Sequence, residues 1–287
     1  MAQSPAHQFG QIIGHMLEEA VRPPLQAVAT KYGLYLDWKH PRAARGGKSK
    51  VSWTDHWGNV HDLDYVLEAG GSEDAIGRPK AFIEIAYRRY TKHSRNKAQE
   101  IQGAISPLAE TYSDDHPFLG VVLAGVFTEA SLAQLRSNAF GVLHFEFAEI
   151  ATAFKTQGID AYFDEGSRDA EVRAKVSAYR KLSAQRKAAI PTALLEQNKK
   201  AFNEFIHQLE VSLNRQVSSV YVLSLHGISR ETQSIEEAIT VINQHDENEA
   251  IRGFVRYEII VRYSNGDEVR GTFESKPEAT RFLNLLK

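Results

Sequence analysis

Two carboxylates in strand-like segments are the residues of this chain best placed to do chemistry. Glu84 lies inside an apolar segment, 80–89, and Asp64 lies in a second strand-like segment, 60–68. A carboxylate inside a strand is costly to bury unless a partner or a metal ion compensates its charge. Two acids on neighbouring strands can share a hard divalent cation such as Mg²⁺, which needs only one or two protein carboxylates. The pair therefore indicates a metal-dependent hydrolytic site.

A cluster of bases begins at Arg88, four residues after Glu84, and continues into the start of the next helix, for which Ser94 is a good N-cap. A second group lies in the loop 39–50, which holds five Lys/Arg and a Gly-Gly pair. Such side chains bind phosphate oxygens, so the two groups are expected to form the walls of a cleft and to hold the phosphates that flank the site. A buried ion pair of Glu84 with Arg88 or Lys80 is the alternative interpretation. The expected phosphate-binding residues are Arg88, Arg89, Lys92, Arg95, Arg45 and Lys48.

The spacing of apolar residues predicts the elements that position the two acids. A helix over 5–31 is expected to break or kink at Pro23 and Pro24. The segment 118–127 is apolar nearly throughout, as expected for a strand covered on both faces. An antiparallel meander that crosses over into such a strand predicts an α/β fold with a mixed sheet flanked by helices. The other expected elements are strands 50–57, 60–68, 80–89 and 141–147 and helices 94–112 and 129–137.

The rest of the chain predicts a connector and a small second domain. Residues 168–200 hold nine Lys/Arg against three Asp/Glu, which fits a solvated helical connector or a helix lying along a phosphate backbone. From residue 202 a βαββα pattern follows, with a hairpin turn at Asn265-Gly266 and no long internal repeat in evidence. The expected division is a core at 1–165, a basic helical connector at 166–200 and a small α+β domain at 201–287.

The order of elements, together with Asp64, Glu84 and the basic helix start after Glu84, resembles the PD-(D/E)XK nuclease superfamily, which includes the restriction endonucleases. The resemblance covers residues 5–150 and implies a restriction-endonuclease-like core. It also implies that Asp64 and Glu84 hold Mg²⁺, with Mn²⁺ as a substitute, and that a glutamate of the first helix adds to the metal site. Glu18 and Glu19 are the candidates, and helical spacing favours Glu19 because it borders the apolar face.

The sequence departs from the family motif at one position. The motif lysine, two residues after the second acid, is Ala86 here. In the family this lysine positions the attacking water and stabilises developing charge. Three options are open: the role has moved to another base, a different residue performs it, or the site is inactive. As a replacement we rank Lys97 of the next helix first, and Arg88, Lys92 and Arg95 follow.

The resemblance implies a Mg²⁺-dependent endonuclease that hydrolyses DNA phosphodiester bonds, of the restriction or defence type. A homodimer would suit duplex cutting, because each subunit then addresses one strand. The alternative is a catalytically silent nucleic-acid-binding module that keeps a nuclease-like fold, and Ala86 is its best support. A second alternative is an interaction protein whose basic helices bind an acidic partner.

Composition limits the classes of function. The formal charge is −2, and residues 201–287, with nine Lys/Arg and thirteen Asp/Glu, carry −4, which leaves +2 for the first 200 residues. A polyanion-binding surface is therefore expected in those 200 residues. The absence of cysteine excludes disulfides and thiolate metal sites. No signal-peptide pattern and no apolar run near the ~20 residues that a bilayer requires are found, so a cytoplasmic location away from membranes is expected.

Overall fold

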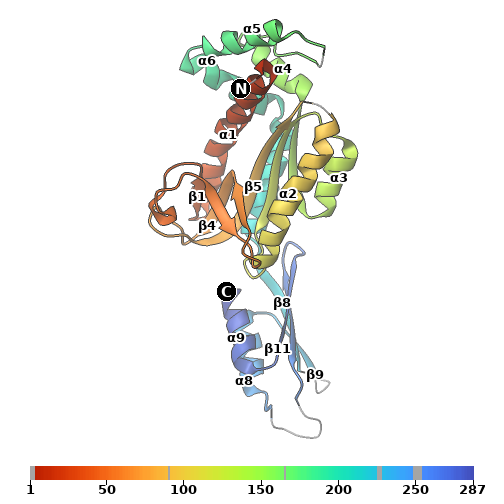
Figure 1. Cartoon of the computed structure of the whole chain (residues 1–287). Helices are drawn as coiled ribbons and strands as arrows, with labels where there is room; N and C mark the ends of the chain where they lie inside the picture. The colour runs from red at the N-terminus through yellow and green to blue at the C-terminus, as the bar shows by residue number, and fades with distance from the viewer. Residues whose placement is uncertain (1–3, 90, 165, 225–227, 248–253) are drawn as a thin grey trace. The chain divides into compact units, whose positions relative to one another are not determined.

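The computed structural model describes residues 4–89, 91–164, 166–224, 228–247 and 254–287, and the side chains of 91–95 and 228 lie outside the described set. The chain divides into two compact units (Figure 1). The first unit holds residues 1–111 and 118–210, and the second holds residues 112–117 and 211–287. Within the described ranges, no helix is long and apolar enough to cross a membrane.

A mixed five-stranded sheet forms the centre of the first unit, in the order β1-β4-β5-β6-β7. β1, β4 and β5 pair antiparallel, whereas β5, β6 and β7 pair in parallel. This is the predicted α/β arrangement of a mixed sheet flanked by helices, with β1 as a strand that the sequence pattern did not indicate. The strands are β1 (Tyr35–Trp38), β4 (Tyr65–Ala69), β5 (Arg78–Arg88), β6 (Phe118–Gly125) and β7 (Phe140–Glu146).

Helices pack on both faces of this sheet. Figure 1 shows α2 and α3 in front of the sheet and α7, in teal, behind it. α1 contacts β5 and β1 and continues as a single helix through Pro23 and Pro24. Its fully buried residues Leu17, Val21 and Leu25 hold the turns on either side of the prolines on one core, which outweighs the local cost of the prolines. The helices are α1 (Pro5–Lys31), α2 (Thr91–Thr111), α3 (Glu129–Ser137), α4 (Phe147–Lys155) and α7 (Lys199–Leu213).

Asp64 lies at the junction between two sheets. β2 (Val51–Thr54) and β3 (Val60–Leu63) form a separate two-stranded hairpin, and β4 of the main sheet begins at Tyr65. The predicted single strand over 60–68 is therefore two strands that belong to different sheets. Asp64 is the one residue between them, at the point where the chain enters the main sheet.

The basic segment predicted as a connector belongs to the first unit. α5 (Asp169–Arg180) and α6 (Ala184–Gln197) pack against α1, and α6 also packs against α4. Each helix has one short apolar stripe, with Val172 and Val176 buried in α5 and Ile190 and Leu194 buried in α6. These stripes are sufficient to dock the helices, so the chain divides after Glu210 and not at 165 and 200.

The second unit is built on a four-stranded antiparallel sheet in the order β11-β10-β8-β9. β9 was missed by the sequence pattern, so the order of elements is ββαββα where βαββα was predicted. Among the described residues, α8 contacts β8 and β9, and α9 contacts β10 and β11. The elements are β8 (Val217–Ser224), β9 (Ile228–Thr232), α8 (Ile235–Gln244), β10 (Tyr257–Tyr263), β11 (Glu268–Phe273) and α9 (Lys276–Leu285).

This order is a duplicated ββα unit, which differs from the expectation of no internal repeat. In the first hairpin Val220 pairs with Thr232, and in the second Ile259, 39 residues after Val220, pairs with Gly271, 39 residues after Thr232. The two central strands pair with each other across a local two-fold axis, at which Tyr221 lies opposite Ile260. The two ββα units therefore share the same strand register.

Candidate active site

The sheet brings Asp64 and Glu84 together. Tyr65 pairs with Ile83, and continuing that antiparallel register by one residue places Asp64 opposite Glu84. Oδ2 of Asp64 accepts a hydrogen bond from the backbone N–H of Ile85, at 2.7 Å. Residues that lie opposite each other on antiparallel strands have their side chains on the same face, so the two carboxylates are neighbours.

Burial and mutual repulsion oppose the ionisation of both acids. Burial raises the pKa of Glu84 to about 8, and the charge of Asp64 acts in the same direction. Burial also raises the pKa of Asp64 to about 6, against the hydrogen bond from Ile85, which lowers it. Two partly buried carboxylates that repel each other favour a bound proton or a bound cation. The pair therefore fits the hard oxygen donor set that a divalent cation needs.

Lys97 of α2 lies against the same pair. Its Nζ is 3.4 Å from Oε1 of Glu84 and 3.8 Å from Oε2 of Glu100, and its side chain is 17% exposed. Ala86, two residues after Glu84 on the same face of β5, is buried and carries no charge. An ammonium group of the neighbouring helix thus lies next to Glu84.

The first helix contributes Glu18 to this region. The charge of Glu18 helps to raise the pKa of both Asp64 and Glu84. The hydroxyl of Tyr65 donates to the backbone carbonyl of Glu18 at 2.7 Å, which fixes α1 beside the start of β4. Glu19, the predicted contributor, is more exposed, and its charge helps to raise the pKa of Tyr65 and Tyr179. The helical spacing suggested Glu19, whereas the packing of α1 on β4 favours Glu18.

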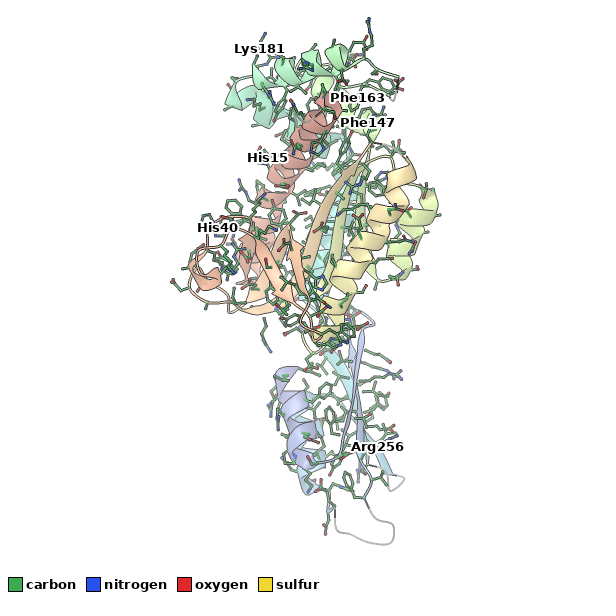
Figure 2. The ribbon with its side chains drawn as sticks, in the orientation of Figure 1. His15, His40, Phe147, Phe163, Lys181 and Arg256 are labelled. Atoms are coloured by element: carbon green, nitrogen blue, oxygen red, sulfur yellow. The ribbon has the colours of Figure 1, made fainter. Side chains whose placement is uncertain are left out.

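Two of the predicted phosphate-binding arginines are engaged within the fold. Arg89 donates to the backbone carbonyl of Phe163, and its guanidinium lies over the ring of Phe147 at 3.8 Å; Figure 2 labels both aromatic residues. Arg45 donates to the carbonyls of Trp38 and His40, and its side chain is 7% exposed. We therefore correct both assignments: these guanidinium groups tie loops to the core.

The other predicted bases fall into two groups. Arg88 donates to the carbonyl of Tyr87 and lies 3.8 Å from Glu100, with 34% of its side chain exposed. Lys48 is exposed. The side chains of Lys92 and Arg95 lie outside the described residues. Arg88 and Lys48 thus keep surface that a phosphate could reach.

A buried ion cluster holds the loop 39–50, and the sequence pattern did not reveal it. The guanidinium of Arg42 donates to both carboxylate oxygens of Glu68, at 2.8 and 2.9 Å, and lies 2.8 Å from Asp37. All three side chains are at most 1% exposed. The high content of bases in this loop suggested a phosphate-binding surface, but Arg42 neutralises acids of the sheet. The signal available in the sequence was the pair of acids, Asp37 and Glu68, in apolar surroundings.

Removal of Arg42 is expected to destabilise the first unit. Arg42→Ala leaves the buried Glu68 without its cation and Asp37 with Arg45 alone, which costs roughly 3–5 kcal/mol of the free energy of unfolding. Urea denaturation followed by tryptophan fluorescence measures this loss. Lys48→Ala, in the same loop but exposed, is the control and is expected to change stability by less than about 0.5 kcal/mol. Equal stability of the two variants would show that the cluster contributes nothing.

Among the described residues, no group of three or more His, Asp or Glu side chains is arranged to hold a metal ion. A site formed by the two strand carboxylates is compatible with this result, because Mg²⁺ completes its shell with waters and phosphate oxygens. No protein-family model, curated protein or solved structure matches this chain. Function is therefore argued from the geometry of the site.

Proposed function

We propose that the first unit is a metal-dependent DNA endonuclease with a restriction-endonuclease-like core, of the restriction or defence type. The observation that carries the proposal is the placement of Asp64, Glu84 and Lys97. Three separate elements bring two partly buried carboxylates and an ammonium group together at one point of the sheet. A buried ion pair alone would need one acid, so the second carboxylate and its repulsion favour a cation site.

Asp64 and Glu84 would hold Mg²⁺, or Mn²⁺ in its place, and Glu18 would add negative charge beside them. When bound, the metal lowers the pKa of a coordinated water and offsets charge on the leaving oxygen. The N–H of Ile85 orients the carboxylate of Asp64. Lys97, 3.4 Å from Glu84, would hold the attacking water or stabilise negative charge that develops on the phosphate.

A catalytically silent nucleic-acid-binding module is the second candidate, and Ala86 favours it. The second carboxylate, Asp64, argues against it, because a relic that only neutralises Glu84 with Lys97 has no need of another buried acid beside the pair.

A homodimer would place one active site on each strand of a duplex. Light scattering with and without DNA measures whether the protein is a monomer or a dimer.

A plasmid-nicking assay tests the proposal. Wild type is expected to convert supercoiled DNA to nicked and linear forms with Mg²⁺ or Mn²⁺ and to leave it intact with EDTA. Asp64→Ala and Glu84→Ala, prepared in the same way, control for contaminating nuclease and are expected to leave the plasmid supercoiled. Cleavage that survives both substitutions would contradict the site. DNA binding by a wild type that cuts no substrate would favour the silent module.

A further inference from the structure

A cavity of about 320 Å³ lies beside the proposed catalytic acids, and Asp64 forms part of its wall. Its other walls come from α1, from the end of β1 and from the loop that follows it. The cations among its lining residues are Arg22 and Lys39, and Trp38, His40 and Tyr65 provide ring surface. Figure 2 labels His15 and His40, which mark two sides of this region. The cavity therefore places two bases beside one member of the carboxylate pair.

Arg22 is held in place for contact with a ligand. Its guanidinium lies over the indole of Trp38, 4.3 Å from the ring centroid. Trp38 in turn stacks with His40 at 4.7 Å, and Nδ1 of His40 is 2.7 Å from the carbonyl of Trp38. Stacking leaves the in-plane N–H donors of an arginine available for hydrogen bonds. In the part of the chain that the structure describes, no carboxylate forms an ion pair with Arg22.

Lys39 is the second cation of the cavity. It is exposed and lines the cavity together with Asp64, and its charge lowers the pKa of Asp64 against the effect of burial. Glu18 and Glu19 also line the cavity, and His15 pairs with both, at 3.8 and 3.5 Å. These acids would repel an anion in the absence of metal, so binding of an anion here is expected to depend on a divalent cation.

We propose that this cavity is a subsite for the phosphate next to the scissile one on the same strand, with Arg22 and Lys39 as its ligands. The inference rests on the proposed nuclease function and adds to it the residues that place the strand. Arginine binds phosphate through paired hydrogen bonds, and lysine binds it as a point charge. A group bound to both lies beside Asp64, so it would fix the neighbouring phosphate at the carboxylate pair. The same donors suit an internal phosphodiester and a terminal phosphate.

Binding measured without turnover tests the subsite. The probe is a short internally labelled duplex, titrated in Ca²⁺ and checked on a gel for intactness, and anisotropy gives its affinity. Arg22→Ala and Lys39→Ala are each expected to weaken binding about tenfold. Each is also expected to reduce the slope of log affinity against log salt concentration by about one, the value of one phosphate contact. The control is Arg173→Ala, an exposed base of α5 with the same change of charge, for which a change below about twofold is expected because distant charges are screened.

The outcomes separate the subsite from the nuclease activity. Equal affinity of Arg22→Ala, Lys39→Ala and Arg173→Ala would overturn the subsite, whatever the nicking assay gives. Tenfold losses in a protein that never cuts DNA would support the subsite and count against the nuclease. Lys39 is exposed and packs against nothing that its loss would unfold, so Lys39→Ala keeps the test valid if Arg22→Ala disturbs Trp38.

Two forms of the probe identify the source of the phosphate. The duplexes differ only in the presence of 5′-phosphates. If the affinity that depends on Arg22 is lost with the terminal phosphate, the subsite holds a strand end. If it is unchanged, the subsite holds an internal phosphodiester. In either case the loss must exceed that of Arg173→Ala for the subsite to stand.

Discussion

Lys97→Ala is expected to lower the rate of DNA cleavage at saturating substrate by about 10²–10³-fold, the loss that follows removal of one group stabilising developing charge. The reason is its position: Nζ lies 3.4 Å from Glu84 and the side chain is mostly buried, so no solvent cation replaces it fully. DNA affinity is expected to change little, because the exposed bases proposed to hold the flanking phosphates remain. Single-turnover cleavage and anisotropy binding separate the two effects.

Two matched variants sharpen this test. Glu100→Ala removes the exposed carboxylate 3.8 Å from Lys97 and is expected to keep near wild-type turnover. Ala86→Lys in the Lys97→Ala background returns an ammonium to the face of β5 that carries Glu84 and is expected to restore part of the lost rate. Normal cleavage by Lys97→Ala, together with loss of cleavage in Arg88→Ala, would assign the role to Arg88.

The metal-free protein is expected to lose stability as the pH rises from about 5 to about 8. Burial raises the pKa of Glu84 from its ordinary 4.5 to about 8, so the folded state binds a proton that the unfolded state releases. The stabilising contribution is complete below about 4.5 and is lost as the pH passes through about 8. Between these values the free energy of unfolding falls by about 1.4 kcal/mol per pH unit. Asp64 acts in the same direction up to about pH 6.

Urea denaturation in EDTA across this range measures the slope. Trp38, Trp53 and Trp57 all lie in the first unit, so tryptophan fluorescence reports on the unit that holds the site. Glu84→Gln is expected to flatten the slope, whereas Glu110→Gln, an exposed change on α2, is expected to leave it unaltered.

Mg²⁺ supplies a second readout that needs no cleavage. At pH 8 it is expected to stabilise wild type, because the ion binds the carboxylates only in the folded state, and to stabilise Glu84→Gln much less. A wild type whose stability neither falls with pH nor responds to Mg²⁺ would show that the two acids do not form a close pair.

The sequence alone determined where the two acids lie and what they resemble. A carboxylate inside an apolar strand is visible from local pattern, and Glu84 lies in the middle of β5 as that pattern indicates. Lys97 could be ranked first because the helix after a strand folds back over it, which brings its first turns near the strand's acid. The spacing of apolar residues along each segment indicates whether it is a helix, a strand with one buried face or a strand with two. The order of these segments then predicts a mixed sheet flanked by helices.

Only the tertiary structure decided which charged groups are taken up by partners far away in the sequence. Arg42 pairs with Glu68, and Arg89 packs on Phe147 and Phe163, so bases that look alike in sequence have structural roles. Glu18, and not Glu19, is the glutamate of α1 whose charge raises the pKa of Asp64 and Glu84, and the Tyr65 hydroxyl bonds to its backbone carbonyl. The repeat in the second unit is visible in the strand register, which backbone hydrogen bonds set and which the side-chain pattern does not reveal. In each case the deciding interaction joins distant segments, and local sequence pattern carries no information about such contacts.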